Sequence, residues 1–171
     1  MTLHQYNKTV HLLADHIFRF ILKNLLNKPL AEDLTQDVFS TLWIHHKEIA
    51  FDKAKAYLFK TAFNLIIDYK RKEKTHQKFQ NEQSFLANQE QYSQKITQDH
   101  FELQELLQQA LDQLPAIQKA VITLRDLEGY SYKEIEEITG LNASQVKVYI
   151  YRGRLFLKHY LETIYEYQQK I

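Results

Sequence analysis

A set of polar and basic side chains near the C-terminus has the residue types and spacing that duplex DNA recognition requires. Ser144 and Gln145 stand at the start of a predicted helix, where short polar side chains can approach base edges and backbone amides can meet phosphate. Lys147, Arg152 and Arg154 follow, with no acidic residue among them. The pattern favours a DNA-recognition helix, and the alternative is a plain helical hairpin within a bundle.

The residues before this helix predict a helix-turn-helix. Ser131 and Glu134 form a capping box, and the short helix that they begin ends at Gly140, a residue suited to a left-handed C-cap. Asn142 and Gln145 repeat the capping pattern at the start of the next helix. Two short helices joined by a tight turn with glycine make a helix-turn-helix. The apolar residues expected to hold the two helices together are Ile135, Ile138, Leu141, Val146 and Ile150.

A second constellation lies in residues 53–78, which contain eight basic residues and two acidic ones. Five of its side chains recur at steps of 4, 3, 4 and 7 and so form one stripe of a helix. They are Lys53, Tyr57, Lys60, Asn64 and Arg71. Cations, an aromatic ring and an amide in one stripe suit a single nucleic-acid strand with exposed bases. The alternative is a solvated helix face.

The composition excludes several other chemistries. The chain has no cysteine, which excludes disulfides, thiolate metal sites and a cysteine nucleophile. Its eight histidines are scattered, and the one adjacent pair, His45 and His46, faces two ways on a helix, so we predict no metal site. No glycine-rich phosphate loop or other catalytic set is present, so we expect neither an enzyme nor a cofactor. No signal peptide or apolar run of roughly 20 residues is found, and we expect a cytoplasmic protein without direct membrane insertion.

Only 3 glycines and 2 prolines occur in 171 residues, which favours long helices over a turn-rich β protein. We predict an all-α fold of two small helical domains. The first, residues 1–74, has three or four helices, including one over residues 53–74 that follows a loop at 46–52. The second, residues 103–171, contains the helix-turn-helix. Residues 75–102, rich in glutamine, are predicted to be a flexible or partly helical linker.

Three segments together resemble the bacterial RNA polymerase sigma factors of the extracytoplasmic-function (ECF) family. Residues 114–161, which contain EGYSYKEIEEITG followed by V-K and R-x-R, resemble the family's region four. AEDLTQDVFSTLW resembles the helix of region two that binds the polymerase clamp, and AYLFKTAFNLIIDYKRK resembles the helix that engages the −10 element. The resemblance implies a region two domain at 1–74 and a region four domain at 103–171. It also implies transcription initiation by core polymerase at −10 and −35 promoter elements.

The resemblance assigns the −35 duplex to the second domain. The positions expected to contact it are Ser144, Gln145, Lys147, Val148, Tyr151, Arg152 and Arg154. Val148, Tyr149 and Tyr151 depart from the small or basic residues common at these positions. Contact with a thymine methyl, or a tyrosine hydroxyl on a phosphate, can substitute, whereas Tyr149 is expected to pack against the preceding helices. We therefore expect a promoter preference different from that of related chains.

The resemblance assigns the melted −10 strand to the first domain. The residues expected to contact it are Phe51, Lys53, Tyr57, Lys60, Asn64, Lys70, Arg71 and Lys72. Asn64 matches a position that the family uses for a promoter base, and residues 49–52 match the segment that holds a flipped base. Lys70, Arg71, Lys72 and Lys74 are expected to hold phosphates. For Phe51 the alternative is an anchor in the hydrophobic core.

The acidic segment 31–48 contains residues that match the surface that docks on the β′ clamp helices of RNA polymerase. The expected contacts are Glu32, Asp33, Gln36, Asp37 and Trp43. An acidic face repels DNA, so a protein partner is physically reasonable, although a solvated face is the alternative. The implied partners are core RNA polymerase (β′ clamp helices and β flap), promoter DNA and an anti-sigma factor. A helix-turn-helix regulator that acts without polymerase is the alternative function.

Overall fold

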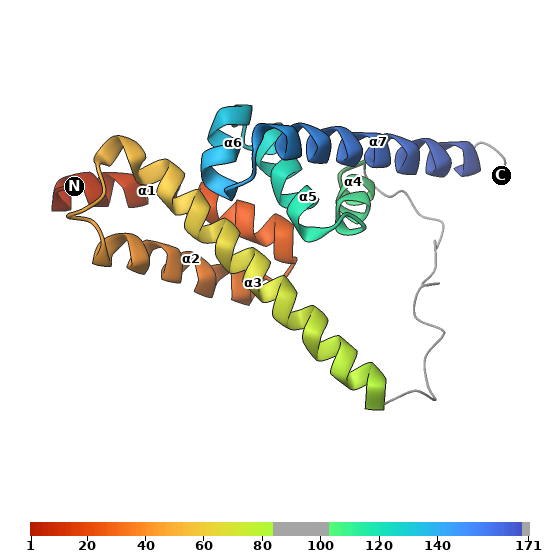
Figure 1. Cartoon of the computed structure of the whole chain (residues 1–171), viewed down its shortest axis with the longest axis horizontal. Coiled ribbons are helices and arrows are strands. Elements are labelled where there is room, and N and C mark those ends of the chain that lie inside the picture. Colours follow the sequence, from red (N-terminus) through yellow and green to blue (C-terminus); the bar gives the residue numbers. More distant parts are fainter. Residues whose placement is uncertain (84–102, 169–171) are drawn as a thin grey trace.

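The computed structural model describes residues 1–83 and 103–168, which form helices joined by short turns, with no strand among them. The helices make one body from which the ends of two long helices project (Figure 1). The predicted all-α fold is confirmed. The low content of glycine and proline accounts for the length of these helices, since few residues interrupt them.

The first helical unit consists of α1 (Leu3–Leu25), α2 (Lys28–Ile44), the 3-10 turn η1 (Phe51–Lys53) and α3 (Ala54–Gln83). α1 begins with a capping box in which Thr2 and Gln5 bond each other's backbone amides. α2 is capped by Asn27, whose side chain accepts a hydrogen bond from the Leu30 amide, and Pro29 stands in its first turn. The fully buried side chains of the three helices meet in one core.

The second unit consists of α4 (Leu103–Asp112), α5 (Ala116–Ile122), the π-helical turn η2 (Thr123–Leu127), α6 (Tyr132–Thr139) and α7 (Ala143–Gln168). α6 and the start of α7 form the helix-turn-helix, and the rest of α7 runs back along α5 and α4. A small apolar cluster of Leu111, Leu114 and Ile122, with Leu157 against it, joins α4 and α5 to α7. α5 and α4 thus brace α7 between the helix-turn-helix and its projecting C-terminal end.

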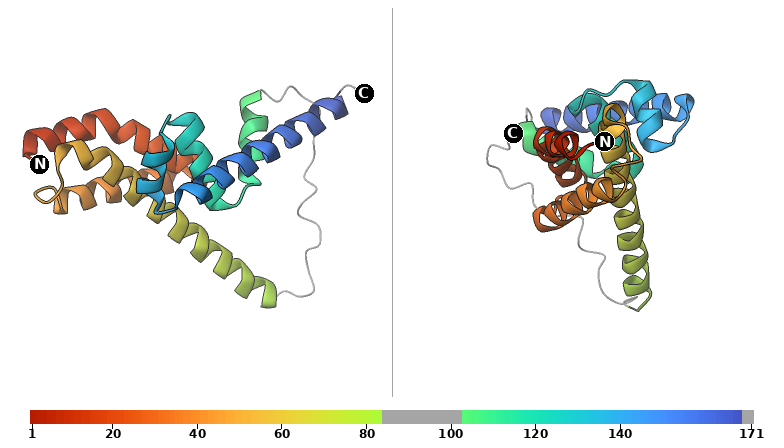
Figure 2. Two further views of the ribbon diagram at one scale, coloured as in Figure 1. Left: turned by 45° about the horizontal axis from the view of Figure 1, so that its top comes forward. Right: turned by 90° about the vertical axis from the view of Figure 1, so that its left-hand side faces the viewer.

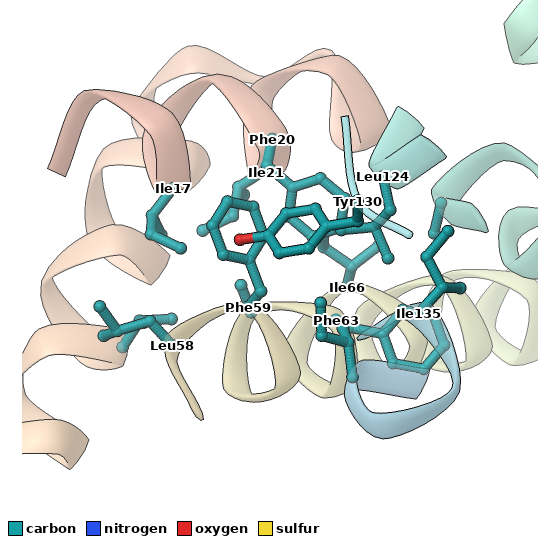
Figure 3. Close-up of a cluster of buried hydrophobic side chains, with 14 of the residues drawn as sticks. Ile17, Phe20, Ile21, Leu58, Phe59, Phe63, Ile66, Leu124, Tyr130 and Ile135 are labelled. Carbon is teal, nitrogen blue, oxygen red and sulfur yellow. The ribbon is translucent and has the colours of Figure 1, made fainter. Parts of the chain in front are cut away.

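The two units pack directly on each other. α6 lies along α3 in every view (Figures 1 and 2). Their buried side chains form one continuous cluster. Figure 3 shows the Tyr130 ring among Phe20, Phe59 and Leu124. Its centroid lies 5.0 Å from that of Phe59 in an edge-on arrangement. The chain therefore has two helical units with a shared hydrophobic core.

The third helix is longer than its pattern predicted. α3 continues to Gln83, whereas we expected a helix over residues 53–74 and a linker from residue 75. Residues 75–83 contain no glycine or proline and are rich in lysine, glutamate and glutamine, which are good helix formers. The rest of the predicted linker, residues 84–102, lies outside the described residues.

Candidate nucleic-acid and polymerase interfaces

The helix-turn-helix has the caps that its sequence predicted. The Glu134 carboxylate accepts hydrogen bonds from the Ser131 amide (2.8 Å) and hydroxyl (2.7 Å), and the Ser131 hydroxyl accepts one from the Glu134 amide (3.3 Å). Gly140 ends α6 in the left-handed conformation, with φ of 73°. Ile135, Ile138, Val146 and Ile150 are buried between the helices, and Leu141 is half-buried. The predicted motif is confirmed.

The start of α7 is held by a reciprocal pair of hydrogen bonds. The Asn142 side-chain oxygen accepts from the Gln145 amide, and the Gln145 side-chain oxygen accepts from the Asn142 amide, both at 2.9 Å. This conformation commits the Gln145 oxygen to the cap and leaves its side-chain NH₂ group for a base. Gln145 therefore has a structural role in addition to its predicted DNA contact.

The predicted −35 contacts form one exposed face of α7. Ser144, Lys147, Val148, Tyr151 and Arg152 are all exposed. Each of them lies three or four residues from another member of the set, which places them on one side of a helix. Tyr151, at 68% exposure, stands almost free of the protein. This face combines the two cations Lys147 and Arg152, the hydroxyls of Ser144 and Tyr151, and the apolar surface of Val148 and the Tyr151 ring.

Two further residues of α7 have structural contacts. Arg154 forms a two-pronged pair with Asp126 of η2, in which its Nε donates to the carboxylate at 3.0 Å. Tyr149 is half-buried and packs against the shared core, as its pattern predicted. Arg154 thus ties η2 to the recognition helix, and a DNA contact requires that it leave Asp126 or reach DNA with the same group.

The basic stripe begins at Lys53 of η1 and continues along α3. Lys53, Lys60, Asn64 and Arg71 are exposed, whereas Tyr57 is half-buried against the core. Two further cations, Lys70 and Lys72, flank Arg71 on this helix. Lys72 is exposed, Lys70 donates to Glu73 at 2.9 Å, and Arg71 pairs with Asp68 at 3.0 Å. The polar residues predicted to contact the −10 strand thus lie on α3, except Lys53, which lies in η1 just before it.

Phe51 lies in η1, immediately before the basic stripe. It is 38% exposed, and Lys8 of α1 lies 5.9 Å from its ring centroid. The alternative in which Phe51 anchors the core is therefore wrong. An exposed aromatic ring beside two exposed cations leaves the predicted contact with a base sterically open.

The predicted polymerase-binding residues share the outer side of α2. Glu32, Asp33, Gln36 and Asp37 are exposed. Trp43 packs edge-on against Tyr6 (4.9 Å between centroids) and stacks on His46 (4.4 Å), yet 43% of it remains exposed. A shallow hollow of about 340 Å³ beside these residues is lined by Ala14, Asp15, Phe18, Glu32, Thr35 and Gln36. An acidic face with a fixed aromatic edge and a hollow can receive a protein surface.

Sequence reasoning missed a buried cation. Lys119 of α5 is 6% exposed, and its Nζ donates to the Asp112 carboxylate (2.6 Å) and to the Asn24 carbonyl at the end of α1 (3.2 Å). Burial lowers the pKa of Lys119, and the hydrogen bond with Asp112 opposes this effect. No pattern in the sequence predicts this burial, because the end of α1, with the Asn24 carbonyl, belongs to the other unit.

Two classes of site are absent from the described ranges, residues 1–83 and 103–168. No three of their histidine, aspartate or glutamate side chains gather as a metal site. None of their helices is both long and apolar enough to cross a membrane.

A helix-turn-helix with a cationic face, packed on a unit with a basic stripe and an acidic surface, defines a transcription protein that contacts both DNA and protein. Residues 9–76 match the family Sigma-70 region 2, and residues 104–157 match Sigma-70, region 4. ECF RNA polymerase sigma factor SigM of Bacillus subtilis is 30% identical over 142 residues, which cover 83% of this chain and 86% of SigM. RNA polymerase sigma factor SigV of the same organism is 34% identical over 146 residues, which cover 82% of this chain and 83% of SigV. The chain therefore belongs to the ECF family of sigma factors.

A solved structure confirms the fold. The sigma factor RpoE of Bartonella quintana, in complex with the anti-sigma factor NepR, matches with a TM-score of 0.71 at 23% identity. The match covers 92% of this chain and 96% of RpoE. As an ECF sigma factor, the protein binds core RNA polymerase and directs promoter-specific initiation. It is not an enzyme, because polymerase performs the chemistry.

Proposed function

We propose that three helices divide the work of initiation among themselves. The exposed face of α7 reads the −35 duplex, the stripe of α3 holds the melted −10 strand, and the acidic side of α2 docks on the β′ clamp helices. The observation that carries the proposal is the separation of charge among these helices. α7 and α3 present exposed cations, whereas α2 presents exposed carboxylates that would repel DNA.

The two DNA sites suit different forms of nucleic acid. α7 is the second helix of a helix-turn-helix, and its first two turns have the length and exposure that a major groove admits. Asn64 of α3 offers a donor and an acceptor to a base, and Phe51 of η1 and Tyr57 of α3 offer rings for stacking. Lys53, Lys60 and Arg71 supply charge along the strand. Duplex readout at −35 and single-strand readout at −10 follow from these differences.

Regulation by an anti-sigma factor follows from the same surfaces. A protein that covered α2, or that held α3 and α7 away from DNA, would stop initiation. The neighbour from Bartonella quintana is a sigma factor held by such a partner, which supports an equivalent partner for this chain. The site of action is the bacterial cytoplasm, where the polymerase and promoter DNA are found.

Run-off transcription with core polymerase on a promoter library tests the proposal. Wild-type protein should select templates with defined −10 and −35 elements. Arg152→Ala should weaken selection at −35, and Asn64→Ala selection at −10, each by about 1–3 kcal/mol per lost base contact. Both variants should still co-elute with core polymerase, whereas Asp33→Lys should lose co-elution. Lys133→Ala, which removes an exposed cation of α6, is the matched control. Equal behaviour of all four variants would reject the assignment of roles.

A further inference from the structure

The first turns of α1 lie beside the turn that presents Phe51. The start of α1 and η1 lie at the same end of the body (Figures 1 and 2). The Met1 amino nitrogen donates hydrogen bonds to the carbonyls of His46 (2.7 Å) and Ile49 (3.2 Å), in the loop that leads to η1. These bonds join segments that are far apart in the sequence, so the start of α1 has a defined position against the loop.

The same turns of α1 are also anchored on α2. The Tyr6 hydroxyl donates to the Phe39 carbonyl at 3.2 Å, and the Tyr6 ring packs edge-on against Trp43. Thr9 is buried, at 3% exposure. Lys8 stands between Tyr6 and Thr9 in the sequence, and its side chain is exposed. The backbone of Lys8 is therefore held in place while its ammonium group is available to a ligand.

The ammonium group of Lys8 lies over the exposed ring of Phe51. Its Nζ is 5.9 Å from the ring centroid, a distance at which a cation is still attracted to an aromatic face. Across residues 1–83 and 103–168 Lys8 forms no ion pair, whereas Arg19, further along the same helix, pairs with Asp15 at 3.0 Å. A cation without a carboxylate partner can bind phosphate without first breaking another contact, and the counterions released from the DNA favour that binding.

No acidic residue accompanies Lys8 on this part of the helix. Residues 3–14 contain no aspartate or glutamate, and the first acid of α1 is Asp15. His4 and His11 are exposed one turn to either side of Lys8 and share its side of the helix. Each has a ring N–H that can donate to a phosphate oxygen. We call His4, Lys8 and His11 the α1 face, which suits a polyanion, in contrast to the acidic side of α2.

We propose that the α1 face is a further binding site for the melted −10 strand, in which Lys8 binds the phosphate next to the base that stacks on Phe51. The inference rests on the proposed function of Phe51 and α3. Phosphate contacts fix the register of a strand, and stacked rings hold its bases. Lys8 and His4 lie outside residues 9–76, which match Sigma-70 region 2, so the contact is no part of the matched family pattern.

Binding of a forked promoter by the holoenzyme tests this contact. The probe has a duplex −35 segment and an unpaired −10 strand, with the sequence that run-off selection yields. One lost phosphate contact on a single strand should lower the slope of log K against log salt by about 0.7, which corresponds to about fivefold weaker binding at about 0.1 M salt. Lys8→Gln should show this loss, and Lys8→Arg should recover affinity and slope because it keeps the charge. Wild-type affinity of Lys8→Gln across the salt range would overturn the inference.

A charge control and a second probe separate this contact from a general effect. Arg19→Gln removes one positive charge from the same helix, roughly 16 Å further along at about 1.5 Å per residue. Its salt slope should equal that of wild type. A −35 duplex without the −10 strand should bind wild type and Lys8→Gln alike. Equal weakening of both probes by Lys8→Gln would mean that Lys8 acts through overall stability or charge, and would contradict a site on the −10 strand.

A double-mutant cycle tests the pairing of Lys8 with Phe51. If Lys8 holds the phosphate next to the stacked base, Lys8→Gln should weaken binding less in a Phe51→Leu background than in wild type, because the strand is no longer fixed beside the lysine. Both single variants should retain the unfolding free energy of wild type in urea within about 0.5 kcal/mol, as exposed side chains do. Independent effects of the two substitutions would reject a shared nucleotide.

Cleavage from a tethered iron chelate locates the strand directly. The chain has no cysteine, so His4→Cys supplies one thiol to which the chelate is attached before assembly with core polymerase. On the forked promoter the cuts should fall on the unpaired −10 strand. Lys60→Cys, on the stripe of α3, is the reference for the proposed function. If Lys60→Cys gives no cuts, the proposed role of α3 fails. If Lys60→Cys cuts the strand and His4→Cys does not, the α1 face alone fails.

Discussion

Asn142 and Gln145 bond to each other twice, each side-chain oxygen accepting the other's backbone amide at 2.9 Å. The recognition helix thus begins on a closed ring of hydrogen bonds before it meets any DNA. A glutamine side chain can recognise adenine through two hydrogen bonds, but these require its oxygen and its nitrogen together. In the described conformation the cap occupies the oxygen.

The first prediction separates capping from DNA reading at Gln145. Gln145→Ala should lower the free energy of unfolding by about 0.5–1 kcal/mol, because half of the capping box is lost. Gln145→Glu should retain stability, since its carboxylate still accepts the Asn142 amide near the positive end of the helix, but it should weaken DNA binding by charge repulsion. Urea unfolding and filter binding to a −35 duplex measure the two effects. A Gln145→Ala variant of unchanged stability would contradict the cap.

The second prediction concerns the pair of Arg154 and Asp126. Because both groups are partly exposed, Asp126→Asn should change the free energy of unfolding by no more than about 1 kcal/mol. The same change releases the Arg154 guanidinium from its partner and removes a negative charge near α7. Affinity for DNA of any sequence should then rise, and the slope of its salt dependence should steepen. Arg154→Ala in the Asp126→Asn background should abolish the gain.

The third prediction concerns Gly153, where α7 crosses α5. A Cβ atom at this position would lie 2.0 Å from Cδ1 of Ile122, which is itself only 2% exposed. Gly153→Ala should therefore destabilise the protein, since overpacking costs about 1–3 kcal/mol and the helix propensity of alanine returns only about 1 kcal/mol. Thermal or urea unfolding measures the loss.

A partner substitution makes this prediction specific. Ile122→Val removes the Cδ1 atom in conflict and alone costs about 0.5–1.5 kcal/mol. The double variant should lose less unfolding free energy than the two single variants lose together, because the smaller side chain makes room for the new methyl group. Strict additivity in this cycle would mean that the helices move apart instead.

Local features of the fold were readable from the sequence, and contacts between units were not. The capping boxes at Ser131 and Asn142 and the stop at Gly140 are short-range patterns with a fixed stereochemistry, and the structure has them as predicted. The length of α3 was underestimated because the change in composition after residue 74 does not end a helix. A polar composition indicates that a segment is exposed to solvent, but it does not determine whether its backbone is helical.

The shared core could not be predicted for a different reason. Phe59 and Phe63 lie on α3 beside the apolar face that packs within the first unit, so the sequence pattern does not reveal that a second unit covers them. Lys119 likewise reads as a surface cation until the end of α1 supplies a carbonyl for it. Which helix covers which face is decided by tertiary contacts far apart in sequence, and a single sequence without alignment holds no direct record of them.

The last prediction concerns pH and the cap of α6. The pKa of Glu134 is lowered, chiefly by the hydrogen bond from the Ser131 hydroxyl, then by that from the Ser131 amide and by the charge of Lys55. A carboxyl with a lowered pKa in the folded state stabilises the fold at pH values above its ordinary pKa, and this contribution is lost as the pH falls through the lowered value. The difference in unfolding free energy between wild type and Glu134→Gln should therefore be constant near neutral pH and shrink below about pH 4.5.

Urea unfolding of both proteins between neutral pH and pH 3 measures this difference, and other carboxyl groups cancel in the comparison. Glu137→Gln is the matched control, because it removes an exposed carboxylate from the same helix without touching the cap. Its difference from wild type should show no comparable fall. Ser131→Ala should reduce stability by about 1 kcal/mol near neutral pH and weaken the pH dependence assigned to Glu134, since it removes the largest cause of the lowered pKa. A pH dependence unchanged in Ser131→Ala would show that another group titrates there.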